Sequence, residues 1–269
     1  MQVIPINRSS VREVVVSASL NEIIEFTNKY LGITRIRDYC PNGLQVEGKG
    51  SVSKIAVGVT ASQAFIEQAV AKGADLLIVH HGYFWKGENQ VITGQKKRRI
   101  KTLLQNDISL AAYHLPLDVH TEVGNNVMLG RLFGLQNCAT HEVDGLPLLS
   151  SGELPVPLPL DEWVASVESA LGRKPQLVRC PAGPKLVSRI AWCTGGAQSF
   201  INQAETLGAD LYLSGEISEP TFHAVMEGSL HYLAAGHHAT ERYGVQALGD
   251  ILAAEFDVKV EYIDIDNPV

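Results

Sequence analysis

Two adjacent histidines, His80 and His81, stand at the end of an apolar run formed by residues 76–79. Four apolar residues bounded by Asp75 and Gly82 are typical of a buried strand. Successive side chains of a strand point to opposite faces. Neighbouring histidines there cannot easily bind one ion, but they can bind two neighbouring ions. The structural alternative, a buried histidine followed by one on a surface loop, is the more common for an isolated pair.

Two further segments place a carboxylate four residues after a histidine. His114 and Asp118 follow Ala-Ala-Tyr, and His237 and Glu241 follow Ala-Ala-Gly. One such pair is common on helices and indicates little. Ligands of an α/β sheet gather at the carboxyl ends of its strands. Since all three segments are predicted strand ends, we expect them to converge on one crevice.

An internal repeat with an offset of 135 residues supports this expectation. Residues 55–76 align with residues 190–211 without a gap, and eleven of the twenty-two positions are identical. Each copy is typical of a strand-helix-strand unit, which favours parallel pairing. The repeat therefore predicts a duplicated α/β fold. The first copy continues into His80 and His81, and the second into Ser-Gly-Glu216.

These segments supply three imidazoles and two carboxylates that are candidate metal ligands. They are His80, His81, Asp118, His237 and Glu241. This donor set suits zinc, iron, manganese, nickel or cobalt. A single tetrahedral catalytic ion takes three protein ligands, so five side chains fit two divalent ions better, with one carboxylate as a bridge. Two adjacent ions are a recurring hydrolytic arrangement, because they lower the pKa of a bridging water.

Two residues near this set have open roles. Glu216 is a candidate catalytic residue, as a general base or as the residue that orients a metal-bound water; pairing with a surface cation is an equal alternative. His114 either forms a hydrogen bond behind the ligands through one ring nitrogen or simply packs.

Four other features have a functional and a structural interpretation. His238 and Arg242 either contact a phosphate or belong to an exposed loop. Residues 194–196 either bind an anion at a helix start or, more commonly, form a tight turn. The aromatic residues 83–85 either stack on a base or pack in a loop. The basic run 96–101 is typical of a solvated helix face, the alternative being a phosphate-attracting rim.

Composition limits the class of protein. The 269 residues are 45% hydrophobic and 19% charged, as in a soluble globular protein of one large or two ordinary domains. The net charge of -7 disfavours a broad nucleic-acid surface. Four scattered cysteines without a C-x-x-C pair indicate reduced thiols and a cytoplasmic location. We expect no signal peptide and no membrane span.

Local signals predict where several elements begin and end. A capping box from Ser19 predicts a helix that starts at residue 20. Thr60 is expected to cap a second helix, which ends at Gly73. Four prolines within residues 147–159 predict a connection or an extended edge segment, and an organisational boundary there.

Several of these segments together resemble one known family. They are residues 38–47 (Asp-Tyr-Cys-Pro-Asn-Gly-Leu-Gln-Val-Glu), 79–86 (Val-His-His-Gly-Tyr-Phe-Trp-Lys), 114–118 and 236–242. They resemble the YbgI-type dinuclear metal-centre proteins of the NGG-interacting-factor-three superfamily, often labelled type 2 GTP cyclohydrolase I homologs. The resemblance runs from about Leu20 to the end, and residues 1–18 look like an extension beyond it.

The resemblance implies two similar, intertwined three-layer α/β/α domains and a toroidal homohexamer whose metal pairs face the interior. We expect residues 1–126 with 233–269 to form the first domain, which carries most ligands, and residues 127–232 to form the second. By resemblance, His81 and Asp118 bind one metal, His80 and His237 bind the other, and Glu241 bridges them.

The expected function is metal-dependent hydrolysis of a nucleotide or purine-like small molecule by metal-bound hydroxide, which in a cyclohydrolase attacks C8 of guanine. The alternative is a non-catalytic, metal-containing ring that binds a protein or a nucleic-acid strand; the acidic total charge disfavours the strand.

Overall fold

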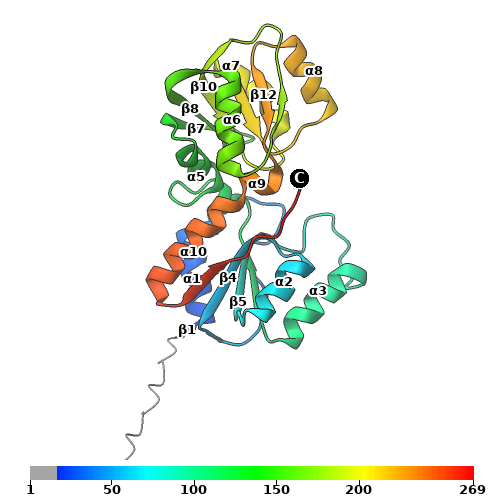
Figure 1. Cartoon of the computed structure of the whole chain (residues 1–269). Helices are drawn as coiled ribbons and strands as arrows, with labels where there is room; N and C mark the ends of the chain where they lie inside the picture. Colours follow the sequence, from blue (N-terminus) through cyan, green and yellow to red (C-terminus); the bar gives the residue numbers. More distant parts are fainter. Residues whose placement is uncertain (1–16) are drawn as a thin grey trace, which may run out of the picture.

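Two β-sheets organise the computed structural model, which describes residues 17–269. Figure 1 shows them in separate halves of the molecule. The first sheet contains, in spatial order, β13 (Lys259–Tyr262), β4 (Lys54–Thr60), β5 (Leu76–His81), β6 (Ser109–Ala112) and β2 (Gly43–Val46). The second contains β7 (Gln136–Val143), β8 (Leu146–Pro159), β10 (Leu186–Trp192), β11 (Leu211–Ser214), β12 (His231–Ala234) and β9 (Gln176–Val178). A separate antiparallel pair joins β1 (Ala18–Ser19) to β3 (Ser51–Val52).

The first sheet has helices on both faces. Strands β4, β5 and β6 are parallel, with β13 parallel to β4 and β2 antiparallel to β6. One face packs against α1 (Leu20–Tyr30) and α10 (Arg242–Phe256), and the other against α2 (Gln63–Ala71) and α3 (Gly94–Gln105). Because both faces of β5 are covered, residues 76–79 are buried throughout. A central parallel strand requires this uninterrupted apolar run.

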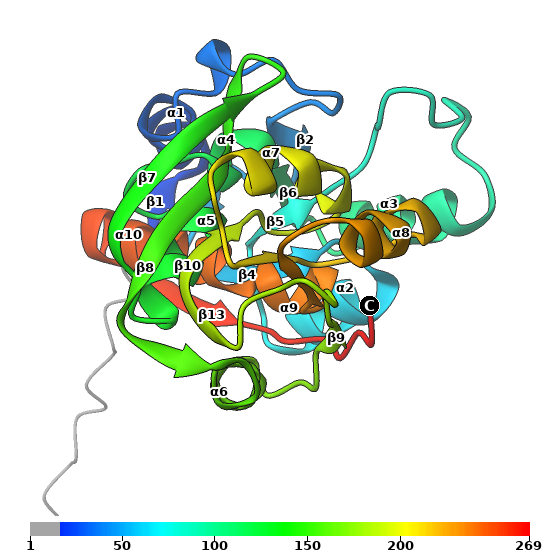
Figure 2. The ribbon, with the colours of Figure 1, turned by 90° about the horizontal axis from the view of Figure 1, so that it is seen from above.

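The second sheet repeats this plan. Strands β10, β11 and β12 are parallel, and β8 and β9 are antiparallel to their neighbours. One face packs against α5 (Asn125–Leu132) and α6 (Leu160–Leu171), and the other against α7 (Ile201–Thr206) and α8 (Glu219–Glu227). Figure 2 shows β7 and β8 as a long twisted hairpin along one side of the molecule. Each sheet is thus the middle layer of three.

The two copies of the internal repeat occupy equivalent places. The first copy forms β4, α2 and the start of β5, and the second forms β10, α7 and the start of β11. The expected α/β class is confirmed, with two similar halves. After β12 the chain returns to the first sheet through α10 and β13, so the halves are intertwined. The domain boundaries remain a prediction, and a boundary before residue 233 would divide β12, which lies whole in the second sheet.

The expected capping residues of two helices need correction. Helix α1 begins at residue 20 as predicted, but the Ser19 side chain makes no capping hydrogen bond. The cap of α2 is Ser62, whose hydroxyl accepts from the backbone N–H of Phe65 at 3.2 Å, whereas Thr60 is the last residue of β4. Sheet pairing extends the strand to Thr60, so the helix must begin later than the sequence indicated.

The prolines of residues 147–159 do not mark a boundary, because they all belong to β8. Strand β8 pairs with β7 only as far as Glu153 and with β10 as far as Pro159, so the last three prolines lie in an extended edge segment, as expected. Pro155 and Pro157 lie between Glu153 and Leu158, where the register with β10 shifts. A proline has no N–H to donate and is tolerated at such irregularities.

No helix within residues 17–269 is long and apolar enough to cross a bilayer. Most of the expected N-terminal extension, residues 1–16, lies outside the described residues.

Candidate metal centre

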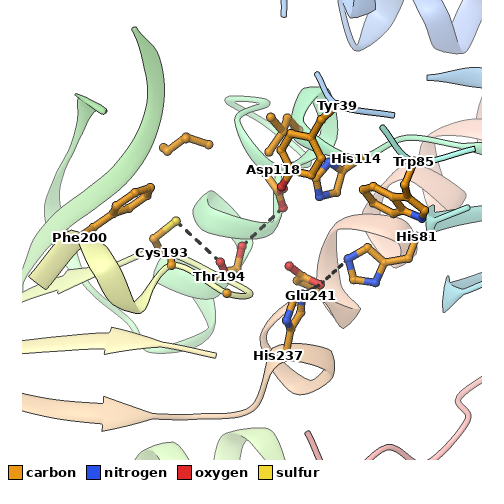
Figure 3. Close-up of a pocket in the computed structure, with 14 residues that line it drawn as sticks. Tyr39, His81, Trp85, His114, Asp118, Cys193, Thr194, Phe200, His237 and Glu241 are labelled. Carbon is orange, nitrogen blue, oxygen red and sulfur yellow. Dashed lines mark hydrogen bonds and ion pairs between the residues drawn. The ribbon is translucent and has the colours of Figure 1, made fainter. Parts of the chain in front are cut away.

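The carboxyl ends of strands β5, β6 and β12 meet between the two sheets. His80 and His81 end β5, and Asp118 ends the short helix α4 (Leu115–Asp118) that follows β6. His237 begins α9 (His237–Thr240) after β12, and Glu241 follows it directly. Figure 3 shows His81, His237 and Glu241 pointing toward one another, with Asp118 across the same space. The fold therefore brings all the expected strand ends together at one place.

The Glu241 carboxylate contacts all three histidines of this set. Its Oε1 lies 3.5 Å from Nε2 of His80, and its Oε2 lies 3.2 Å from Nε2 of His81 and 3.1 Å from Nε2 of His237. Oδ1 of Asp118 lies 3.5 Å from Nε2 of His80. Two groups of candidate ligands result, each with its donor atoms within 4.8 Å of one another: His80, Asp118 and Glu241, and His81, His237 and Glu241.

This grouping by proximity differs from the division that the resemblance implied, and the assignment of each ligand to an ion stays a prediction. His80 lies with Asp118 rather than with His237, and His81 lies with His237 rather than with Asp118. Alternation along β5 still separates the two histidines, since His80 is fully buried whereas His81 faces the cavity. Alternation alone did not indicate which carboxylate each ring meets, because Asp118 and Glu241 come from different halves of the fold.

In each of the three imidazoles, the ring nitrogen Nδ1, which faces away from Glu241, contacts a neighbouring polar group. Nδ1 of His80 donates to the carbonyl oxygen of Tyr113 at 2.9 Å. Nδ1 of His237 donates to Oε1 of Glu216 at 2.6 Å, and Nδ1 of His81 lies 3.3 Å from the Thr60 hydroxyl. Such outer contacts fix the ring orientation and leave Nε2 to face inward, as in metal-binding histidines.

Two buried atoms at the centre have no hydrogen-bond partner among the described residues. They are Nε2 of His80 and Oε2 of Glu241. Donor atoms that share one ion at about 2.1 Å, at angles of about 90–110°, lie about 3.0–3.4 Å apart. The contacts of 3.1–3.5 Å around Glu241 agree with that spacing. The residues therefore fit bound metal.

Electrostatics also favours a cation here. Burial lowers the pKa of His80, but the Asp118 and Glu241 carboxylates outweigh it and raise that pKa to about 10. Burial, together with His80 and His237, lowers the pKa of His81 to about 3 despite Glu241. Two buried carboxylates thus attract positive charge, while His81 keeps a free lone pair. Metal ions satisfy both demands.

A cavity of about 420 Å³ opens onto the centre. His81, Asp118, His237 and Glu241 form its floor (Figure 3). The other lining residues are Tyr39, Trp85, His114, Leu115, Leu148, Cys193, Thr194, Gly196, Ala197 and Phe200. A small molecule in this cavity would contact the candidate ligands directly.

The structure places the two residues of open role beside the ligands. Glu216 holds His237, and its function as a general base or in orienting water stays a prediction. His114 lines the cavity and is bonded through Nδ1 to Oδ1 of Asp38 at 3.0 Å, so it makes a specific contact rather than only packing.

The weaker features mostly have structural roles. His238 is buried and bonds Asp264 at 3.0 Å, and Arg242 bonds the carbonyl of Leu171. Residues 194–196 form a turn, in which Gly195 N donates to the Thr240 hydroxyl at 3.1 Å.

The aromatic and basic segments divide between the cavity and the surface. Tyr83 is buried in the core, whereas Trp85 lines the cavity. The basic run belongs to α3 and does not line the cavity; its Lys96 pairs with Glu88 at 3.3 Å.

Two residues of the site, Asp38 and Phe200, were not candidates in the sequence analysis, and Gly195 was expected there only as part of an anion site or a turn. Asp38 was quoted only within a family-like segment, although Asp-x-x-x-Asn is a recognisable turn pattern. Gly195 and Phe200 both belong to the second repeat copy, which offers no charged side chain at these positions. The approach of Gly195 to Glu241, and the place of Phe200 in the same cavity, depend on the packing of the two halves.

Taken together, the fold and the site define an intertwined, duplicated α/β protein with a candidate metal centre between its sheets. A family model described as Duf34/NIF3 (NGG1p interacting factor 3) matches residues 18–268, and the chain belongs to this family.

Relatives agree over nearly the whole chain. A Pseudomonas aeruginosa protein named GTP cyclohydrolase 1 type 2 homolog is 53% identical over 252 residues, which cover 93% of this chain and 98% of the relative. The Escherichia coli K12 protein of the same name is 52% identical over 247 residues, or 92% and 98% of the two chains. A solved structure of the protein ybgI, described as of unknown function, is 50% identical, covers 94% of this chain and 100% of its own, and has a TM-score of 0.89.

Proposed function

We propose that this chain binds two divalent metal ions and hydrolyses a nucleotide or purine-like small molecule. The observation that carries the proposal is the position of Glu241. Its two carboxylate oxygens face different groups of candidate ligands, which is what a bridging residue must do. The unpartnered Nε2 of His80 and Oε2 of Glu241 support the same conclusion.

In this proposal the protein supplies orientation and charge. His80 with Asp118, and His81 with His237, would hold the two ions together with Glu241. Zinc, iron, manganese, nickel or cobalt suits these donors, and two such ions activate water for hydrolysis. Asn125 donates to Oδ1 of Asp118 at 2.9 Å and so keeps that carboxylate in place.

The substrate class follows from the cavity and from the relatives. Tyr39, Trp85 and Phe200 give the cavity aromatic walls that suit a flat ring. The name GTP cyclohydrolase 1 type 2 homolog belongs to the relatives, and its reference to a purine nucleotide agrees with such walls. The basic run 96–101 lies on α3, so we assign it no phosphate contact.

The test combines metal analysis with turnover. We expect purified protein to contain two ions per chain by elemental mass spectrometry, and to hydrolyse at least one member of a nucleotide and nucleoside panel. Activity should vanish on chelation and return with one of the five metals. Two ions without turnover of any panel member would contradict the hydrolase proposal and favour the non-catalytic ring. A chain that binds no ion under any loading condition would contradict both.

Glu216 is proposed to act on catalysis through His237 or as a general base. Glu216→Gln is expected to weaken metal binding about 10–100-fold if its main task is to orient the His237 ring. A general base would instead show nearly normal metal content with a fall in kcat of about 100-fold or more. Metal titration and kcat of the reconstituted variant separate the two roles, and wild-type values for both would exclude them.

The toroidal homohexamer with inward-facing metal pairs and the cytoplasmic location are also proposals, supported by the resemblance and by the scattered cysteines. Light scattering of the purified chain tests the assembly: a hexamer mass supports it, and a monomer or dimer contradicts it.

A further inference from the structure

Asp38 and His114 form a hydrogen-bonded pair that belongs to neither group of Glu241-centred ligands. Oδ1 of Asp38 accepts from Nδ1 of His114 at 3.0 Å and from the N–H of Tyr39 at 2.7 Å. Its Oδ2 accepts from the N–H of Leu115 and from the side-chain amide of Asn42, both at 2.9 Å. Each oxygen of this carboxylate therefore already accepts two hydrogen bonds.

This network fixes which nitrogen of His114 carries the hydrogen. The surrounding donors, acting against burial, also hold the pKa of Asp38 down to about 2, so the group is ionised at neutral pH. An ionised carboxylate only accepts, so Nδ1 of His114 is the donor. In the neutral ring Nε2 then offers a lone pair. No hydrogen bond to Nε2 is present within the described residues.

The backbone of His114 is anchored as firmly as its side chain. Its N–H donates to the side-chain carbonyl of Asn42 at 2.7 Å. The ring meets Tyr39 and Trp85 edge to face, with centroids 5.0 and 4.9 Å away. These contacts hold the ring in the cavity wall, and Figure 3 shows it beside Trp85 above the candidate ligands.

The rest of the cavity suits a flat molecule. Tyr39 and Trp85 belong to the first half, whereas Phe200 comes from the second half and lines the far side. A planar ring between these walls would present its edge to the floor and to His114. Most of the remaining lining is apolar, with Leu115, Leu148 and Ala197. An acceptor fixed in an apolar wall is suited to discriminate between ligands by their donors.

We propose that His114, positioned by Asp38, selects the substrate by accepting a hydrogen bond at Nε2 from an N–H group on the edge of a planar heteroaromatic ring. This inference rests on the proposed function only for the type of ligand, a purine. It assigns His114 to ligand selection rather than to metal binding, although His80, His81 and His114 also lie close enough to share an ion.

The test measures ligand selectivity on the metal-loaded protein by calorimetry, without turnover. The probes are inosine, which carries an N–H at the ring edge, and purine riboside, which lacks one. We expect wild-type protein to bind inosine about tenfold more tightly, because purine riboside would leave the buried acceptor without a hydrogen-bond partner. His114→Phe keeps a flat ring and should remove this preference while the metal content stays at the wild-type level.

Asp38→Asn is the second variant, because it leaves His114 in place. An asparagine brings an N–H₂ group among the donors that Asp38 now satisfies, so His114 should lose its fixed tautomer and the inosine preference should fall. His223→Phe, on the exposed surface of α8, is the matched control and should keep the preference. The ratio of the two affinities is the readout, because a general loss of structure would weaken both ligands together.

Several outcomes would overturn the proposal. A wild-type protein that binds neither probe, or binds both equally, contradicts it. So does His114→Phe with an unchanged preference, and loss of metal in that variant would make His114 a ligand instead. Failure of the proposed hydrolysis is a separate result, because selective binding would persist in a protein that turns over neither probe.

Discussion

Replacing Glu241 with glutamine is expected to remove both metal ions, weakening binding at least about 100-fold at each position. The reason is that both carboxylate oxygens are used, one toward His80 and the other toward His81 and His237. A glutamine keeps one oxygen and replaces the other with an N–H₂ group, which cannot bind a cation. It also removes one of the two buried negative charges that attract the ions. Hydrolysis should be lost together with the metal.

Elemental analysis after dialysis against a metal buffer measures this effect, with circular dichroism to show that the variant is folded. Glu219→Gln is the matched control, since Glu219 is an exposed glutamate that pairs with His223. Asp118→Asn should be less severe, because Asp118 belongs to one ligand group and its loss should leave one ion per chain. Wild-type metal content in Glu241→Gln would overturn the ligand assignment.

Gly195→Ala is expected to disrupt the same candidate metal centre, because Gly195 belongs to the second half of the fold and packs against Glu241. A Cβ at this position would lie 2.1 Å from Oε1 of Glu241 and 3.1 Å from Nε2 of His237. Since the first distance is far shorter than any real contact, the carboxylate must move away from its position. The backbone φ of +69° adds strain for a side chain, at about 1–2 kcal/mol. We expect metal affinity to fall about 10–100-fold and stability to fall by at least that strain.

The neighbouring glycine provides a close control. A Cβ on Gly196 would have its nearest contacts at 3.7 Å, to Glu216 and His237, which is ordinary van der Waals distance. Gly196→Ala should therefore retain nearly normal metal affinity. Metal titration and urea unfolding of both variants in chelator measure the two effects separately. Equal behaviour of the two variants would contradict the argument that Glu241 needs the space above Gly195.

Much of the fold could be predicted from local patterns. The apolar run of residues 76–79 requires burial on both faces, and only a central parallel strand supplies it. The repeat indicated that this strand has a counterpart in β11. Local signals were misleading where strand pairing determined the structure. Thr60 was expected to cap α2, but it is the last residue of β4. The prolines of β8 were interpreted as a boundary, because a strand tolerates proline only at positions that depend on its neighbouring strands.

The five candidate ligands were predicted from residue type and spacing, because imidazoles and carboxylates at strand ends have few other uses in combination. How they group in space depends on the tertiary structure. The alternation of side chains along β5 shows only that His80 and His81 point to opposite faces of the sheet. Which of them meets Asp118 depends on how β6 packs beside β5 and how α9 approaches from the second half.

The sequence by itself thus determined the class of fold, the ligand types and the presence of two similar halves, because these are recorded in local periodicity and in the repeat. Only the tertiary structure decided the grouping around Glu241, the space that Gly195 leaves for it, and the pairing of Asp38 with His114 across 76 residues. Those features arise from contacts between segments far apart in the chain, and no local pattern specifies the distance between two such segments.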